Sequence, residues 1–233
     1  AASEEVKQSE IDEEGGDVVR MAEKLTPAPS QKEIGATGDI EQAKTWAIKT
    51  AKSLKDMGIN VNFAPVADVG SNDKRSYSTD ANTVIDFVRA ATKGYQQENI
   101  IYSLKHFPGI GKGKVDSHID SSSIDVAKEV LMTEDILPFK TIIDESDPND
   151  YFILVSHLKY LALDEEYPAS LSSKIMTDLL RNELGYKGII ITDDMEMGAV
   201  ANHNDFRSIG VNAVKAGADI VLVCHEYKHQ QEV

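Results

Sequence analysis

The sequence has one cysteine and one tryptophan among its 233 residues, and aromatic side chains make up only 6% of it. A single cysteine cannot form a disulfide within the chain, so the fold must depend on its core. No apolar run reaches the roughly 18 residues needed to cross a bilayer, so we expect no membrane-spanning segment. Basic residues are also scarce: 24 Lys and Arg stand against 39 Asp and Glu, for a net charge of −15. A surface of this sign repels a phosphate backbone, so we expect no nucleic-acid partner.

The remaining composition fits one globular domain. Hydrophobic residues make up 41% and charged residues 27% of the chain, enough to bury a single large core. The first ten residues, AASEEVKQSE, are polar and lack the basic and apolar stretches of a signal peptide. We therefore predict a polar tail over residues 1–10 and one domain over 11–233. Because such a tail is typical of a chain from which a signal peptide has been removed, we favour the cell envelope or secretion over the cytoplasm.

Strand-like and helix-like segments alternate along the chain. Short apolar runs rich in Val and Ile predict five strands, at Ile59–Val66, Asn99–His106, Tyr151–His157, Gly188–Asp193 and Asp219–Cys224. Between them, apolar residues recur with helical spacing over Ala43–Met57, Val84–Tyr95 and Ile175–Leu184. The alternation predicts an α/β fold with a parallel sheet, either a (β/α) barrel or a doubly wound sheet. Both architectures place ligands at the carboxyl ends of the strands.

Polar and charged side chains gather at those predicted strand ends. They are Asp68, Arg75, Lys105, His106, His157, Asp193 and Asp194. Since an unpaired charge is costly to bury, the set as a whole predicts a substrate pocket. No glycine-rich dinucleotide motif or P-loop follows a strand, so nucleotide binding has no support.

The segment Lys105–His118, KHFPGIGKGKVDSH, joins a strand end to a glycine-rich loop and an Asp-x-His pair. In an extended backbone Asp116 and His118 project to the same side, so the carboxylate can hold the imidazole tautomer and raise its basicity. Such a pair suits general acid/base catalysis.

This segment resembles a signature of glycoside hydrolase family 3, in its bacterial β-N-acetylglucosaminidase branch. That signature has the form K-H-F-P-G-H-G-D-T-x-x-D-S-H, and Lys105–His118 shares its length and both of its ends. Thr192–Met197 is similar to the family's nucleophile motif, [ST]-D-[DAS]-[LM]-x-M, directly after a predicted strand. Three further stretches are similar to other segments of the family: Ile11–Arg20, Asn62–Val69 and Pro168–Ile191.

The resemblance implies a (β/α)8 TIM-type barrel and a retaining exo-β-N-acetylglucosaminidase that acts on cell-wall or chitin-type saccharides. It implies that Asp193 is the nucleophile of a covalent glycosyl-enzyme, and that His118, oriented by Asp116, is the acid/base. The positions that match sugar-binding residues of the family are Asp12, Arg20, Arg75, Lys105 and His106. The partner implied is a saccharide, with no cofactor and no metal, and the oligomeric state stays open.

Three further side chains near these positions receive different interpretations. Adjacent side chains diverge where a strand passes into a loop, so we expect Asp194 to face away from the sugar if Asp193 faces it. We interpret His157 as a hydrogen-bonded support of the barrel rim. Tyr77 is the candidate for stacking on the sugar.

The chain also departs from the family pattern. Ile110 and Lys112 stand where the family usually has His and Asp. Five predicted strands and a stump at Ile11 fall short of the eight that close a barrel, and only ten residues precede Ile11. We therefore expect a barrel that lacks its N-terminal elements, with its final unit also in question.

Four alternatives stay open. A metal-dependent barrel hydrolase could use Asp116, His118 and Asp120, or His106 with His157, as ligands. A sugar-binding barrel without turnover, or another family 3 β-glycosidase, would use a pocket in the same place. Transfer to phosphate instead of water is the fourth, because a neutral histidine repels an anionic acceptor less than a carboxylate does.

Overall fold

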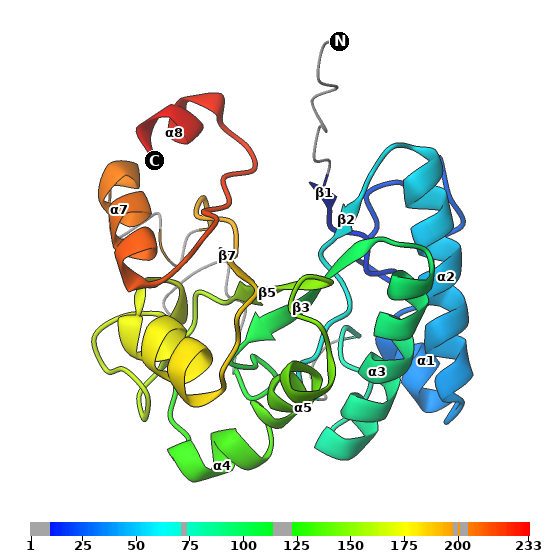
Figure 1. Cartoon of the computed structure of the whole chain (residues 1–233), viewed down its shortest axis with the longest axis horizontal. Coiled ribbons are helices and arrows are strands. Elements are labelled where there is room, and N and C mark those ends of the chain that lie inside the picture. The colour runs from blue at the N-terminus through cyan, green and yellow to red at the C-terminus, as the bar shows by residue number, and fades with distance from the viewer. Residues whose placement is uncertain (1–9, 71–73, 114–122, 198–199, 201–204) are drawn as a thin grey trace.

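A computed structural model describes residues 10–70, 74–113, 123–197, 200 and 205–233. Its main sheet is parallel, with the strand order β1-β2-β3-β5-β7. These strands are Glu10–Ile11 (β1), Val61–Asn62 (β2), Ile101–Phe107 (β3), Tyr151–Val155 (β5) and Ile189–Thr192 (β7). The sheet is curled, and Figure 1 shows α2 and α3 on one flank of it, α4 and α5 below and α7 on the opposite flank. The predicted α/β fold with a parallel sheet is confirmed, whereas the described strands form part of a barrel and not a closed eight-stranded one.

The helices follow the predicted periodicity. The three that the spacing indicates are α2 (Ile40–Asp56), α3 (Ala81–Gln97) and the π-helix η2 (Lys174–Glu183). The others are α1 (Gln31–Ala36), α4 (Lys128–Thr133), α5 (Leu137–Glu145), the 3₁₀ turn η1 (Ala169–Leu171), α7 (Phe206–Ala216) and α8 (Tyr227–Glu232). Two short strands, β4 (Ser123–Ile124) and β6 (Lys159–Tyr160), pair with each other apart from the main sheet. Among the described residues, no helix is both long enough and apolar enough to span a bilayer.

Side-chain caps and a glycine mark where the longer helices begin and end. The Asp39 carboxylate accepts a hydrogen bond from the Glu41 N–H at 3.1 Å before α2, and Asp80 accepts one from the Thr83 N–H at 2.8 Å before α3. At the end of α7, Gly217 has a φ of +119°, in the region that only glycine enters easily. These local signals set the direction in which each helix returns to the next strand.

Both faces of the strands are buried. Along β5, Tyr151, Ile153 and Val155 belong to the large core that the helices cover. The alternate residues, Phe152 and Leu154, belong to a smaller cluster on the other face, built from strand residues and their extensions. Burial on both sides explains why the strand sequences are almost continuously apolar.

Two of the five predicted strands differ from the observed structure: one forms no strand and the other is much shorter than predicted. The prediction of a strand at Asp219–Cys224 is wrong: the segment runs beside β7 but forms only an isolated bridge, between Ile220 and Ile191. The Leu222 N–H donates to the Thr192 hydroxyl at 3.0 Å and not to a backbone carbonyl, which interrupts the ladder. The strand expected at 59–66 is reduced to the two residues of β2. Pro65 has no N–H to donate, so regular pairing cannot continue through it.

Removing a fully buried side chain from the middle of the sheet tests this assignment of the core. Leu104 on β3 is 0% exposed and belongs to the helix-covered core. We expect Leu104→Ala to lower the free energy of unfolding by about 2–5 kcal/mol, through lost burial and the cavity that remains. Val214→Ala on α7, at a side chain 59% exposed, should change it by less than about 0.5 kcal/mol. Urea denaturation measures both, and equal losses would contradict the assignment.

Candidate active site

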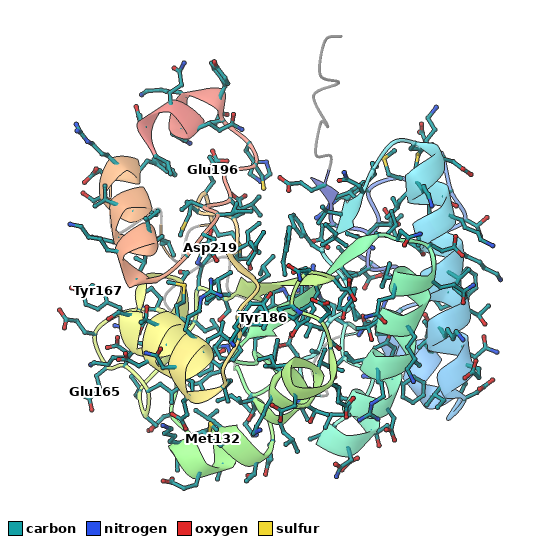
Figure 2. All side chains as sticks on the ribbon, in the orientation of Figure 1. Met132, Glu165, Tyr167, Tyr186, Glu196 and Asp219 are labelled. Carbon is teal, nitrogen blue, oxygen red and sulfur yellow. The ribbon has the colours of Figure 1, made fainter. Side chains whose placement is uncertain are left out.

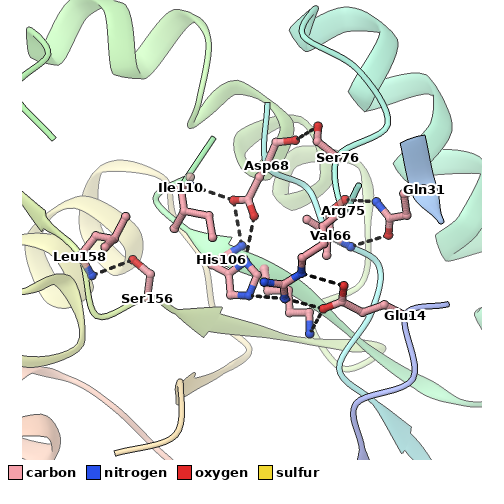
Figure 3. Close-up of polar contacts among 12 residues, drawn as sticks. Glu14, Gln31, Val66, Asp68, Arg75, Ser76, His106, Ile110, Ser156 and Leu158 are labelled. Atoms are coloured by element: carbon pink, nitrogen blue, oxygen red, sulfur yellow. Dashed lines mark hydrogen bonds and ion pairs between the residues drawn. The ribbon is translucent and has the colours of Figure 1, made fainter. Parts of the chain in front are cut away.

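Six charged or titratable side chains meet at the carboxyl ends of β1, β2 and β3. We call them the charge cluster: Asp12, Glu14, Asp68, Arg75, Lys105 and His106. They come from segments far apart in the sequence, which the parallel sheet brings to one edge. Figure 3 labels Glu14, Asp68, Arg75 and His106 of this cluster. Four of the five predicted sugar-binding residues belong to this cluster.

Glu14 lies at the centre of the charge cluster. Its Oε1 is 2.5 Å from the Lys105 Nζ and 2.6 Å from the Arg75 Nη2, and its Oε2 accepts from the Arg75 Nε at 2.9 Å. The Lys105 ammonium also donates to Asp12 at 2.6 Å. Both Glu14 and Lys105 have side chains only 2% exposed. A buried lysine needs such partners, because an unpaired ammonium would be costly to remove from water.

The ionisation of these two groups follows from their contacts. Burial would raise the pKa of Glu14, but Lys105 and Arg75 outweigh it and lower that pKa to about 2. Burial would lower the pKa of Lys105, but Glu14 and Asp12 outweigh it and raise it. Both side chains are therefore charged at neutral pH.

Arg75 and Asp68 fix the tautomer of His106. Because a guanidinium only donates, the His106 Nε2 must accept the 3.0 Å hydrogen bond from the Arg75 Nη2. The ring proton is then on Nδ1, which donates to Asp68 at 2.8 Å. Asp68 also accepts from the backbone N–H groups of His106 and Ile110, at 3.1 and 2.9 Å. One carboxylate thus joins the end of β2 to the end of β3 and to the glycine-rich loop.

Asp193 follows β7. Of the three predicted catalytic residues, it is the one that lies within the described part of the chain. Its N–H donates to the Val155 carbonyl at 2.9 Å, and its Oδ1 accepts from the Asp194 N–H at 2.9 Å. Among the described residues, its second carboxylate oxygen has no hydrogen-bond partner. Burial would raise the pKa of Asp193, but His157, the Asp194 N–H and Lys105 outweigh it and lower that pKa. An ionised carboxylate with a free oxygen is suited to act as a nucleophile.

Asp194 has different surroundings from Asp193. Its Oδ1 accepts from the backbone N–H groups of Glu196 and Cys224, at 3.1 and 3.2 Å. The carboxylate of Asp194 is therefore occupied in holding the loop after β7, and the two adjacent carboxylates have separate partners, as the sequence predicts.

The structure confirms the interpretation of His157 as a buried support. Its Nε2 donates to the Asp194 carbonyl at 2.8 Å, and its Nδ1 pairs with the Ser170 hydroxyl at 2.7 Å. All four ring nitrogens of His106 and His157 are thus occupied by protein groups, which argues against that pair as metal ligands. Among the described residues, no group of three His, Cys, Asp or Glu side chains has a geometry that could hold a metal ion.

The other expected residues lie elsewhere. Arg20 is exposed, and its backbone N–H donates to the Glu13 carboxylate at 2.7 Å. Asp116, His118 and Asp120 are outside the described residues. The expectation that Tyr77 stacks on a sugar is wrong, because its ring is only 6% exposed and stacks on Phe87 at 5.2 Å.

Lys112, one of the departures from the family pattern, makes its own contacts. Its ammonium pairs with the carboxylates of Glu134, at 2.6 Å, and of Asp135. These two acids lie between α4 and α5, so Lys112 ties the glycine-rich loop to the helices below it.

Sequence reasoning missed Glu14, and it placed Asp68 in the predicted pocket without giving it a specific role. The signal that could have found Glu14 is Lys105 itself. Ile101, Ser103 and Lys105 alternate along β3 on the inner face of the sheet, and an ammonium there requires a nearby acid. The acids that follow Ile11 are the nearest candidates on the neighbouring strands.

A model of the glycosyl hydrolase family 3 N-terminal domain matches residues 8–233. The chain belongs to this family. Its match covers the charge cluster, Asp193 and the glycine-rich loop together, so the resemblance seen in the separate motifs extends over the domain.

Relatives of this family 3 chain include β-hexosaminidases. It is 37% identical to β-hexosaminidase A from Pseudoalteromonas piscicida over 235 residues, which covers 91% of this chain and 39% of that one. It is 30% identical to a β-hexosaminidase from Nitrosomonas eutropha, over 93% of this chain and 64% of the relative. A family 3 β-N-acetylglucosaminidase from Paenibacillus sp. superposes with a TM-score of 0.92 at 35% identity, over 97% of this chain and 44% of that one. The chain therefore spans less than two thirds of the length of these three relatives.

Replacing Glu14 tests the charge cluster through its pH dependence. In the fold the pKa of Glu14 is about 2, against 4.5 ordinarily, so the interaction stabilises the protein fully above about pH 4.5 and is lost as the pH falls towards 2. We expect Glu14→Gln to lower the free energy of unfolding at pH 7 by on the order of 3 kcal/mol. The difference from the wild type should shrink between about pH 5 and pH 2.

Urea denaturation at a series of pH values measures this difference. The control is Asp144→Asn, which removes an exposed ion pair with Lys140 and should change the free energy by less than about 0.5 kcal/mol at every pH. A Glu14→Gln difference that stays constant with pH would argue against an ionised Glu14 at the centre of the cluster.

Proposed function

We propose that this chain forms the barrel domain of a retaining exo-β-N-acetylglucosaminidase. It removes terminal β-linked N-acetylhexosamine from cell-wall or chitin-type saccharides. The observation that carries the proposal is the carboxylate of Asp193, one oxygen of which has no hydrogen-bond partner among the described residues and whose pKa is lowered by His157, the Asp194 N–H and Lys105. The β-hexosaminidase and β-N-acetylglucosaminidase relatives support this choice of reaction and sugar.

The reaction proceeds by two displacements at the anomeric carbon. Asp193 attacks that carbon and forms an ester, while the bond to the leaving oxygen breaks and His118 gives that oxygen a proton. Water then attacks the same carbon, gives a proton to His118, and releases the Asp193 carboxylate. Each displacement inverts the configuration, so the product retains it. Asp116 holds the tautomer of His118 that each step requires.

Some side chains of the charge cluster bind the sugar, and the others hold those side chains in position. Asp12 and Arg75 have side chains 31% and 30% exposed, so their outer atoms can bond the hydroxyls of a terminal sugar. Lys105 and His106 lie beneath them. Arg20, which is close to Asp12 in the sequence, supplies a further cation. Glu14 and Asp68 orient these side chains without reaching the sugar. Fixed donors and acceptors of both kinds suit a neutral pyranose, whose hydroxyls need both.

Loss of the nucleophile is the first test. We expect Asp193→Ala to lower kcat/KM on an aryl N-acetyl-β-glucosaminide by on the order of 10⁴-fold or more, because the carboxylate that forms the ester is lost. Binding of N-acetylglucosamine, followed by calorimetry, should persist. Asp144→Asn serves as the surface control. Hydrolysis that survives Asp193→Ala would overturn the assignment, and a wild-type chain that binds the sugar without turnover would indicate a sugar-binding barrel.

The acid/base role of His118 predicts a dependence on the leaving group. His118→Ala should slow substrates with basic leaving groups by about 10²–10⁴-fold and activated aryl glycosides much less, because an acidic leaving group departs without a proton. Initial rates on a series of aryl glycosides measure the difference. A loss of equal size across the series would count against His118 as the acid. Comparing products with and without phosphate separates hydrolysis from phosphate transfer.

A further inference from the structure

The loop that carries Asp193 is held from two sides. On the β5 side, Val155 accepts from the Asp193 N–H and His157 donates to the Asp194 carbonyl, at 2.9 and 2.8 Å. On the other side lies the segment from Leu222 to His229, where the Leu222 carbonyl accepts from the Met195 N–H at 2.9 Å. Each side thus includes a backbone hydrogen bond, and on the second side several side-chain contacts are added to it.

Glu196 supplies three of the contacts on the second side. Its Oε2 accepts from the His225 N–H at 2.5 Å, and its Oε1 accepts from the Glu226 N–H at 2.9 Å and from the His229 Nδ1 at 2.6 Å. The side chain is only 7% exposed. Burial would raise the pKa of Glu196, but His229 and the two backbone N–H groups outweigh it and lower that pKa. Figure 2 shows Glu196 below α8, where the loop after β7 meets the C-terminal segment.

His229 and Asp194 extend this contact. The His229 ring stacks on Phe206 of α7, with centroids 3.8 Å apart, so it is fixed on its far side. The His225 Nε2 is 3.1 Å from the Asp194 Oδ2. Two acids of the loop, Asp194 and Glu196, therefore each hold a histidine and backbone N–H groups of the C-terminal segment.

These contacts are linked to the carboxylate of Asp193 by one peptide group, the one whose N–H belongs to Asp194. The Asp194 N–H orients the Asp193 carboxylate at 2.9 Å, and the direction of that N–H depends on the backbone from Asp193 to Glu196. We infer that Glu196 is a positioning residue for the nucleophile, acting through Asp194 and anchored by His229. This inference rests on the function proposed above. The nucleophile motif leaves the position of Glu196 unrestricted, so the motif itself assigns no role to this glutamate.

The isosteric variant Glu196→Gln tests the inference. A glutamine nitrogen cannot accept a hydrogen bond, so at least one backbone N–H loses its partner while the shape of the side chain is kept. We expect kcat on an activated aryl N-acetyl-β-glucosaminide to fall by about 10–100-fold, because small misplacements of a reacting group are costly. KM and the affinity for N-acetylglucosamine should stay within about twofold, since the charge cluster is untouched. The loss should be the same for good and poor leaving groups, unlike that of His118→Ala.

Two further variants separate positioning from folding. Glu232→Gln removes an exposed ion pair with Lys228 within α8 and should leave kcat unchanged. His229→Asn keeps a donor near the place of Nδ1 and should retain more of kcat than His229→Leu, although both lose the stacked ring. Thermal denaturation of each variant shows whether the fold is affected.

The outcomes are distinct. Glu196→Gln that turns over like the wild type, or that loses sugar affinity and melting temperature in proportion to kcat, would overturn the positioning role and leave the proposed function in place. A wild-type chain without turnover would overturn both. A fall in kcat alone, with rescue in His229→Asn, supports the inference.

Discussion

The burial of a lysine ammonium at the end of β3 is the constraint on which the site depends. Lys105 is 2% exposed, and an isolated charge in that position would cost several kcal/mol. The protein meets this requirement with Glu14 and Asp12 from the end of β1, and Arg75 then binds the same glutamate. Because Lys105 and its two acidic partners lie at the ends of β3 and β1 of one sheet, the geometry of the charge cluster is set by the pairing of the strands. Side chains placed in this way are held by several partners, although the carboxyl ends of strands are where loops begin.

Asp193 uses the same edge of the sheet in another way. It follows β7, and its pKa is lowered by His157, by the Asp194 N–H and by Lys105 on β3. The carboxylate is therefore stabilised in its ionised form in part by a member of the charge cluster. A single low-dielectric environment thus links the group that would bind the substrate to the group that would react with it. A substitution in the charge cluster is therefore expected to alter the ionisation of Asp193, so the effects of substitutions at the two places on activity should not be additive.

How far the sequence could predict this structure depends on how local each signal is. The amphipathic periods of α2 and α3 and the apolar runs of β3, β5 and β7 are local, so these elements were predictable. The failure at Asp219–Cys224 was not avoidable by such reasoning, because the Thr192 hydroxyl that takes the Leu222 N–H is 30 residues away. Tyr77 was misjudged because an aromatic residue near a strand end can face either the pocket or the helices. Lys105 and His106 were predicted for the site, but only the fold shows that Glu14 and Asp68 hold them.

The anchoring of the glycine-rich loop by Asp68 has a consequence for variation and design. Ile110 is bonded to the carboxylate that also holds His106, and a Cβ on Gly111 would lie only 1.8 Å from the Val69 carbonyl. The first part of the loop is thus fixed to the charge cluster. A side chain at position 111, or a change in the length of the loop before it, would move the carboxylate that orients His106. This short stretch of loop is therefore expected to tolerate as little change as the strands on either side of it.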